Sequence, residues 1–186
     1  MPKKVHWVDK YLPARACPEA VVKARKYPDP QSAWDAWDNG GDLLWVLQMT
    51  YGDPVKRALC ACDIAESVLP IFERATPEDW RPREVIKAAR VYMLEPTEAN
   101  KRRVYDGIRL AYAALDAVGF CGAGDAAQAA IFAAYAAYGT VNVAYADNAA
   151  YHAYRATDDA TERKAQADIV RKYFPTAPIS AERRDR

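Results

Sequence analysis

The first half of the chain carries tryptophans at spacings that could build a binding surface. Trp34 and Trp37 stand three residues apart, so a helix would place both indoles on one face. Trp45 follows a short distance later, after the acidic residue Asp42 and two leucines. Aromatic side chains framed by charged ones are typical of protein interfaces. The alternative is that these indoles pack the helices of the N-terminal half against one another.

A second cluster combines an aromatic ring with two arginines at an expected helix start. Trp80 is followed by Arg81 and, after one proline, by Arg83. Free backbone N–H groups at a helix start and guanidinium groups both suit a carboxylate or a phosphate, so a small anionic ligand is one candidate here. The alternative is an ordinary helix cap with surface salt bridges, for which Asp79 and Glu84 supply the acids.

Catalytic and metal-binding patterns are missing from the sequence. It has no glycine-rich phosphate loop followed by Lys-Ser/Thr, no Glu-x-x-His pair and no nucleophile elbow. The nearest acid to His152 stands five residues away and points elsewhere on a helix, so we interpret this histidine as structural or surface-exposed. Cys60 and Cys62 are two apart on an expected helix, which disfavours a shared metal ion. We predict a protein that is not an enzyme, with no cofactor and no metal site.

Composition and charge narrow the classes of partner. Lys+Arg 26 against Asp+Glu 25 leaves a formal net charge of +1, which disfavours nucleic acid because phosphate binding usually needs a basic excess. A local anion site remains compatible with this balance. No charged residue stands between Asp125 and Asp147, but this run is dominated by alanine and includes Gln128 and Asn142, so we expect no membrane span. No secretion signal is visible after Met1, and we expect a cytoplasmic protein with reduced cysteines.

Helix starts are marked by a capping side chain placed before a proline. Asp29-Pro30, Asp53-Pro54 and Thr76-Pro77 follow this rule, and proline suits the first helical position because its missing N–H has no partner there anyway. No segment alternates apolar and polar residues long enough to predict a strand. We expect an all-α, single-domain helical bundle over residues 1–175 and a flexible tail over residues 176–186. The seven to eight expected helices cover residues 18–26, 31–38, 42–50, 54–74, 82–94, 97–118, 124–155 and 159–173.

The range 124–155 is predicted as one long, Ala/Tyr-rich helix at the centre of the bundle. It is apolar nearly all round, which is typical of a helix covered by its neighbours. Steps of four and three residues place on one stripe Ile131, Tyr135, Tyr138, Tyr145 and His152, and on the adjoining stripe Ala130, Ala134 and Ala137. We expect the small stripe to pack against the preceding helix or to form a homodimer seam. The tyrosines would fill space while keeping a hydroxyl for hydrogen bonding.

Several segments of the chain resemble a known family. The Ala/Tyr-rich range from Ala126 to Tyr154 and the closing motif from Gln166 to Pro175 resemble the fifth-class immunity-like domain of bacterial and phage genomes. Four shorter segments match as well, so the resemblance covers about residues 16–175. These segments are Ala16-Cys17-Pro18, Ser32–Trp37 with Asp42–Trp45, and Arg81-Pro82-Arg83.

The resemblance implies a non-catalytic, all-helical protein that neutralises a protein toxin or effector by direct binding. The alternative is a phage-borne counter-defence protein that inhibits a host immune enzyme or sequesters a nucleotide signal in a helical pocket. A homo-oligomer stays open under both hypotheses. The candidate binding residues, which match the family's recurring positions, are Trp34, Trp37, Asp42, Trp45, Arg81, Arg83, Asp168 and Arg171. Asp168 and Arg171 are three apart, so they could instead pair with each other.

Overall fold

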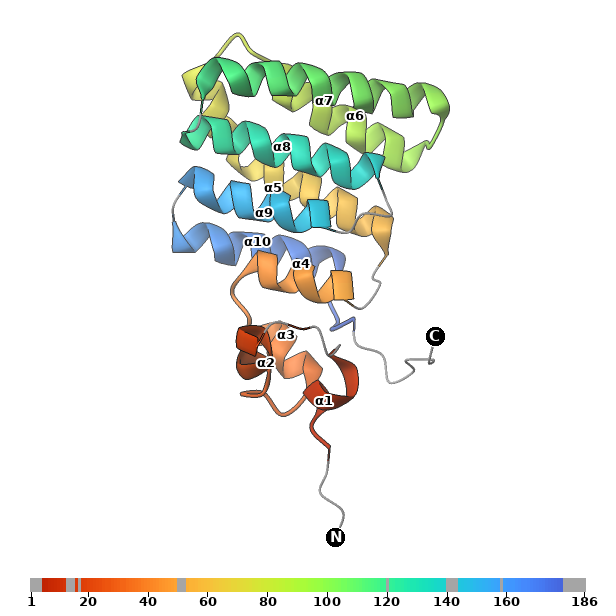
Figure 1. The fold of residues 1–186 in the computed structure, drawn as a ribbon, viewed down its shortest axis with the longest axis vertical. Coiled ribbons are helices and arrows are strands. Elements are labelled where there is room, and N and C mark those ends of the chain that lie inside the picture. Colours follow the sequence, from red (N-terminus) through yellow and green to blue (C-terminus); the bar gives the residue numbers. More distant parts are fainter. Residues whose placement is uncertain are drawn as a thin grey trace.

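Every regular element that the structure describes is an α-helix (Figure 1). The computed structural model describes residues 5–12, 16, 18–49, 53–119, 121–139, 144–157 and 159–178. The helices among them are α1 (Trp7–Tyr11), α2 (Pro18–Ala24), α3 (Pro30–Ala36), α4 (Gly40–Met49), α5 (Pro54–Ala75), α6 (Arg81–Leu94), α7 (Glu98–Val118), α8 (Gly122–Tyr138), α9 (Ala144–Thr157) and α10 (Ala160–Tyr173). The predicted all-α class is confirmed. Two helices were not predicted as separate elements. They are α1 and α9, and α9 lies in the range 124–155 that was expected to form one helix.

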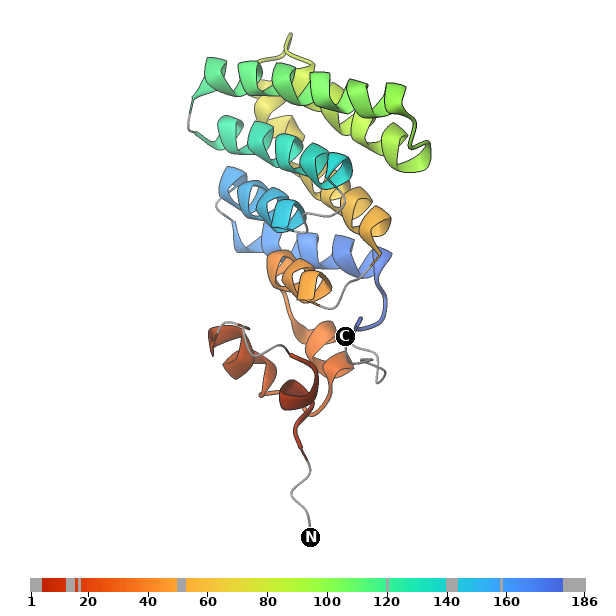
Figure 2. The ribbon, with the colours of Figure 1, turned by 45° about the vertical axis from the view of Figure 1, so that its right-hand side comes forward.

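The longer helices form two layers (Figures 1 and 2). α7, α8, α9 and α4 lie side by side in one layer, and α6, α5 and α10 lie behind them in the other. The short helices α1–α3 sit at the end next to α4. α8 packs against α5, α6, α7 and α9, which makes it the central helix of the bundle. None of the described helices is long and apolar enough to cross a membrane.

Capping aspartates begin two of the helices as predicted. Asp29 Oδ1 accepts a hydrogen bond of 2.9 Å from the backbone N–H of Ser32, and the following proline occupies the start of α3. Asp53 Oδ1 accepts one of 2.9 Å from the N–H of Val55, again with a proline at the helix start. Each carboxylate satisfies a backbone donor that has no partner within its helix. The local sequence therefore determines where α3 and α5 begin.

The predicted helix start at Thr76-Pro77 is wrong. Thr76 ends α5 instead, because its backbone N–H and its hydroxyl both donate to the carbonyl of Phe72. α6 begins only at Arg81, whose backbone N–H donates to the carboxylate of Asp79. Asp79 thus takes the capping role that the sequence pattern assigned to Thr76, and residues 76–80 form the turn between the two helices.

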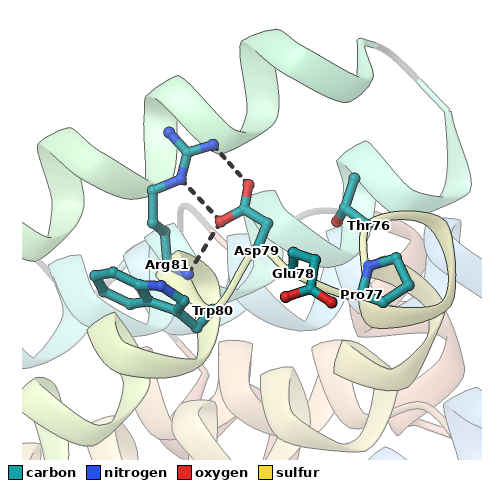
Figure 3. A pocket seen from close by; sticks show the side chains of 6 residues that line it. All are labelled: Thr76, Pro77, Glu78, Asp79, Trp80 and Arg81. Carbon is teal, nitrogen blue, oxygen red and sulfur yellow. Dashed lines mark hydrogen bonds and ion pairs between the residues drawn. The ribbon is translucent and has the colours of Figure 1, made fainter.

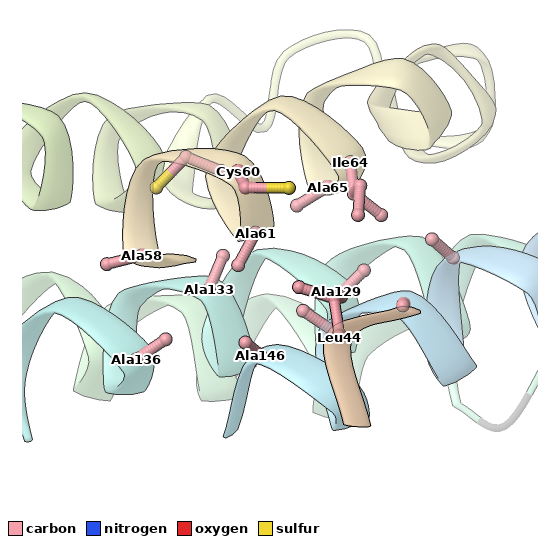
Figure 4. Close-up of a cluster of buried hydrophobic side chains, with 14 of the residues drawn as sticks. Leu44, Ala58, Cys60, Ala61, Ile64, Ala65, Ala129, Ala133, Ala136 and Ala146 are labelled. Carbon is pink, nitrogen blue, oxygen red and sulfur yellow. The ribbon is translucent and has the colours of Figure 1, made fainter. Parts of the chain in front are cut away.

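The interface between α5 and α8 is built from small side chains (Figure 4). Ala58, Ala61 and Ala65 of α5 and Ala129 and Ala133 of α8 are all buried. Since alanine adds only one methyl group, the two helix backbones can approach closely without leaving a void. The small residues of α8 are thus covered within the chain.

The range 124–155 is not one helix, which corrects the prediction. α8 ends at Tyr138, where the N–H of Gly139 donates to the carbonyl of Tyr135, and α9 begins at Ala144. Residues 140–143 lie outside the described residues. Glycine and the β-branched residues that follow it have low helix propensity, which favours a break at this point. α9 runs back along α8, so the stripe Ala130, Ala134 and Ala137 is fully buried within the chain and is no homodimer seam.

The segment after α10 is described only up to residue 178. Within it, the backbone N–H of Ala177 donates a hydrogen bond of 2.8 Å to the side chain of Gln31, at the start of α3. The beginning of the expected tail therefore contacts the N-terminal helices. Residues 179–186 lie outside the described residues.

Candidate functional site

The tryptophans predicted as an interface belong to the core. Trp34 and Trp37 expose only 2% and 3% of their surface. The indole N–H of Trp34 donates a hydrogen bond of 2.9 Å to the carbonyl of Phe174, just after α10. Arg171 donates to the carbonyls of both tryptophans and so caps the C-terminal end of α3. Of the two interpretations, core packing is the one that the structure bears out.

Three more of the predicted binding residues also contact other parts of the fold: Asp42, Trp45 and Asp168. The carboxylate of Asp42 lies 2.7 Å from Nζ of Lys23, and this ammonium group also lies 5.1 Å from the ring centre of Trp37. Trp45 is half-buried against the core. Asp168 forms the ion pair with Arg171 that its spacing allowed, at 3.2 Å. This group therefore joins α2, α3, α4 and α10 to one another.

The arginines at the start of α6 are occupied by the protein's own carboxylates. Arg81 donates two hydrogen bonds to Asp79, of 2.8 and 2.6 Å, and this contact lowers the pKa of Asp79 (Figure 3). Arg83 donates two to Glu73, of 2.5 and 2.8 Å, and lowers the pKa of that carboxyl in turn. Both guanidinium charges are thus compensated by the protein's own carboxylates, which weakens their attraction for an external anion. Residues 76–81 line an open depression here, in which Pro77, Glu78 and Trp80 are exposed, Trp80 with 59% of its surface accessible.

The outward stripe of the central helix is aromatic. Every residue of α8 from 123 to 137 is buried except three, which are half-buried: Gln128, Phe132 and Tyr135. Tyr138, three residues further on, is half-buried as well. These positions follow steps of four, three and three, so they form the one stripe of α8 that other helices leave uncovered.

Tyrosines on the two neighbouring helices extend this stripe into a larger surface, which we call the aromatic face. Its members are Tyr105 and Tyr112 of α7, Phe132, Tyr135 and Tyr138 of α8, and Tyr145, Tyr151 and His152 of α9. Three of them are well exposed, with accessible fractions of 50% for Tyr105, 39% for Tyr112 and 54% for Tyr151. An apolar surface that spans three helices and stays uncovered is typical of an interaction site.

Ring contacts join the helices across the aromatic face. The centroids of Tyr105 and Tyr138 are 6.0 Å apart, which links α7 to α8. Those of Tyr135 and Tyr145 are 5.1 Å apart, with the rings stacked, and link α8 to α9. Burial, together with the neighbouring Tyr112, raises the pKa of Tyr135 to about 12, so its hydroxyl stays protonated at neutral pH. Each ring pair contributes about 0.5–1.5 kcal/mol beyond the area it buries. The face is therefore held in one arrangement.

A polar cluster closes the aromatic face at the N-terminal end of α8. Nδ1 of His152 lies 2.8 Å from Oδ1 of Asp125, and Nε of Arg155 lies 3.3 Å from the other carboxylate oxygen. The imidazole also stacks on Phe132, with ring centroids 5.2 Å apart and planes 7° apart. A carboxylate that orients an imidazole is an arrangement that general acid–base catalysis can use. Within the described residues, however, the bond to Asp125 is the only polar contact of that imidazole.

Comparison with known proteins found no match that could identify the site. No protein-family model matches the chain, and neither a curated protein nor a solved structure matches it. The candidate site therefore rests on its own geometry.

The sequence pattern contained part of the aromatic face but not its exposure. Steps of four and three brought Tyr135, Tyr138, Tyr145 and His152 together on one stripe, and the structure also brings them together. The interpretation as a covered stripe differs from the structure, because α7 and α9 flank α8 without closing over it. Tyr105 and Tyr112 were not singled out. Their spacing of seven on an amphipathic helix is the signal that would have found them.

The other layer of the bundle carries a network of ion pairs. Arg90 lies 2.7 Å from Asp63 and 2.5 Å from Glu66, and so joins α6 to α5. Arg83 adds contacts to Glu66, at 3.6 Å, and to Glu73. The arginines and acids of this surface thus neutralise one another. The surface therefore attracts a charged partner less strongly than a surface with unpaired charges would.

A buried arginine and a half-buried aspartate influence each other where α4, α5 and α9 meet. Arg57 is 6% exposed, and its Nη1 donates to the carbonyl of Leu47 at 3.5 Å. Asp147 faces this arginine, but its Oδ1 is buried and has no hydrogen-bond partner among the described residues. Burial raises the pKa of Asp147 to about 7, although the charge of Arg57 acts in the opposite direction. This carboxyl therefore changes its protonation near neutral pH.

Proposed function

We propose that this chain is a non-catalytic binding protein that holds a partner protein on its aromatic face. The observation that carries the proposal is the outward stripe of α8, the most deeply buried helix, which is aromatic and continues onto α7 and α9. Tyrosine side chains bring a large apolar area and a polar hydroxyl at low conformational cost, and they are enriched in the centres of protein interfaces.

Rigidity of the surface supports the same proposal. Free aromatic side chains lose conformational entropy when a partner immobilises them, and this loss weakens binding. Here the rings of Phe132, Tyr135 and Tyr145 already restrict one another through stacking, and the bond to Asp125 fixes His152. Much of the ordering cost is therefore met on folding, which favours a tight complex.

The family resemblance suggests which kind of partner the protein would bind. An immunity-type protein neutralises a toxin or effector by direct contact, and an exposed, rigid, aromatic surface suits that task. A counter-defence protein that blocks a host enzyme by contact would use the same kind of surface. We therefore place the binding residues on α7–α9, in place of the positions around Trp34 and Arg81.

Sequestration of a nucleotide finds less support. The cavity lined by Trp7, Trp34 and Trp37 has a volume of about 10 Å³, which is room for roughly one water molecule. Arg81 and Arg83, which would have bound phosphate, are engaged by Asp79 and Glu73.

Co-purification with its genomic neighbours tests the proposal. The tagged protein would be expressed with the adjacent genes, and bound proteins would be identified and quantified by mass spectrometry. We expect a stoichiometric protein partner whose affinity falls by at least about tenfold in the double variant Tyr105→Ala/Tyr112→Ala. Trp80→Ala is the matched control, because it removes an exposed aromatic side chain outside the aromatic face. A partner that is lost equally from both variants, or from neither, would contradict the proposal.

A further inference from the structure

We infer that the aromatic face binds an acidic protein surface. This inference rests on the proposed function and specifies the chemistry of the partner. Three cations of α7 carry the inference: Lys101, Arg102 and Arg109. They stand on the same helix as Tyr105 and Tyr112 and belong to its solvent-facing side. An acidic partner would neutralise them while its apolar side chains cover the rings.

The spacing of α7 places these cations next to the rings. Arg102 stands three residues before Tyr105, and Arg109 stands three residues before Tyr112, so each arginine neighbours one tyrosine on the helix surface. Nζ of Lys101 lies 5.7 Å from the ring centre of Tyr138, on the adjacent helix α8. The positive charges thus line the α7 side of the aromatic face.

The cations beside the aromatic face have no acidic partner among the described residues. Within the described residues, Lys101, Arg102 and Arg109 form no ion pair, although the acids Asp106 and Asp116 stand on the same helix. Across the bundle, by contrast, carboxylates of α5 satisfy the arginines of α6. A row of unpaired cations beside an uncovered apolar surface is complementary to carboxylates beside apolar side chains.

Ring geometry favours a protein over single-stranded nucleic acid. Bases bind to such platforms by stacking on free ring faces. Here the imidazole of His152 covers a face of Phe132, and the rings of Tyr135 and Tyr145 cover each other. The half-buried rings of the aromatic face thus have one side already covered, which leaves less ring surface for stacked bases than an open platform would, while the tyrosine hydroxyl groups suit backbone groups of a protein.

Three labelled probes test the inference on the full-length protein by fluorescence anisotropy. The first is a synthetic helical peptide with Glu and Leu in a seven-residue pattern, the second is its counterpart with Lys in place of Glu, and the third is oligothymidylate. We expect the acidic peptide to bind at low salt and its affinity to fall as salt is added. The variant Arg102→Glu/Arg109→Glu should bind it at least about tenfold more weakly.

The control variant Lys87→Glu/Lys164→Glu makes the same change in net charge on exposed positions of α6 and α10. It should bind the acidic peptide like the unaltered protein. Absence of binding to the acidic peptide, preference for the basic peptide or the oligothymidylate, or equal losses in the two charge variants would each overturn the inference.

The co-purified partner separates a failure of this inference from a failure of the proposed function. Loss of that partner in Tyr105→Ala/Tyr112→Ala, but not in Arg102→Glu/Arg109→Glu, would show a partner on the aromatic face that is not acidic. Retention of the partner in the tyrosine variant would contradict the proposed function itself. Loss of the partner in both variants, with the control intact, is the result we expect.

Discussion

Nδ1 of His152 lies 2.8 Å from Oδ1 of Asp125, and this hydrogen bond joins α9 to the first turn of α8. The two residues are 27 positions apart in the chain, so neither one's partner follows from local spacing. Arg155 approaches the second carboxylate oxygen, and Phe132 stacks on the imidazole. One carboxylate therefore fixes both the imidazole of the aromatic face and the packing of the two helices that carry it.

Removal of this carboxylate should destabilise the fold. We expect Asp125→Ala to lower the free energy of unfolding by about 1–3 kcal/mol, because it leaves the largely buried imidazole without its hydrogen bond. Urea unfolding followed by circular dichroism measures the effect. Asp116→Ala is the control, since Asp116 is exposed on α7, and it should change the stability by no more than about 0.5 kcal/mol. Equal stability of the two variants would show that the bond contributes nothing.

The helix pattern was predictable because its signals are local. Asp29 and Asp53, each followed by proline, provide both a cap and a suitable first residue, and the structure begins helices at both places. The break after Tyr138 was missed because alanine-rich sequence continues on both sides of it. Gly139 was the available signal, but a single glycine in a helical pattern costs only about 1 kcal/mol, which tertiary packing often outweighs.

The candidate site was less predictable, because exposure depends on which neighbours cover a residue. Trp34 looked like an interface residue, yet Phe174 accepts its indole N–H from 140 positions away. Tyr135 looked like a covered residue, yet the outward side of α8 is the one side without a neighbouring helix. Periodicity identifies residues that share a face, whereas long-range packing decides whether that face is covered.

Arg171 should stabilise the junction of α3 and α10. We expect Arg171→Met to lower the free energy of unfolding by about 1–3 kcal/mol, because the carbonyls of Trp34 and Trp37 lose a charged donor while the apolar part of the side chain is retained. Lys172→Met is the matched control, since this neighbouring side chain is 74% exposed. Thermal or urea unfolding compares the two variants. A loss of stability in the control alone would contradict the capping role of Arg171.

The close contact of α4 with α10 depends on Gly40. A Cβ atom at Gly40 would lie 2.5 Å from Cβ of Gln166 and 2.8 Å from its carbonyl carbon, so Gly40→Ala must push the helices apart. We expect a loss of about 1–3 kcal/mol in unfolding free energy. Gly41→Ala is the control, because its new Cβ would meet only the side chain of Asn39, at 3.2 Å. Equal unfolding midpoints for the two variants would rule out the contact.

Stability should fall as pH rises toward neutrality because of Asp147. Burial raises the pKa of this carboxyl from 3.8 to about 7 in the folded protein, so the folded state holds the proton more tightly than the unfolded chain does. The resulting stabilisation is fully present below pH about 4 and is lost as pH rises through about 7, with a total of roughly 2–4 kcal/mol. Urea unfolding between pH 5 and pH 8 measures it.

Asp147→Asn isolates this contribution, since asparagine does not titrate. The variant also removes one of the two acids whose charge acts on Arg57, the other being Asp53, which changes the absolute stability, so the slope against pH is the quantity to compare. The two proteins share every other side chain, so contributions from the rest of the molecule cancel in the difference. We expect the free energy of unfolding of the unaltered protein to fall relative to that of Asp147→Asn as the pH rises from 5 to 8. Parallel profiles would place the pKa of Asp147 near its ordinary value, and would mean that water reaches a carboxylate that the structure buries.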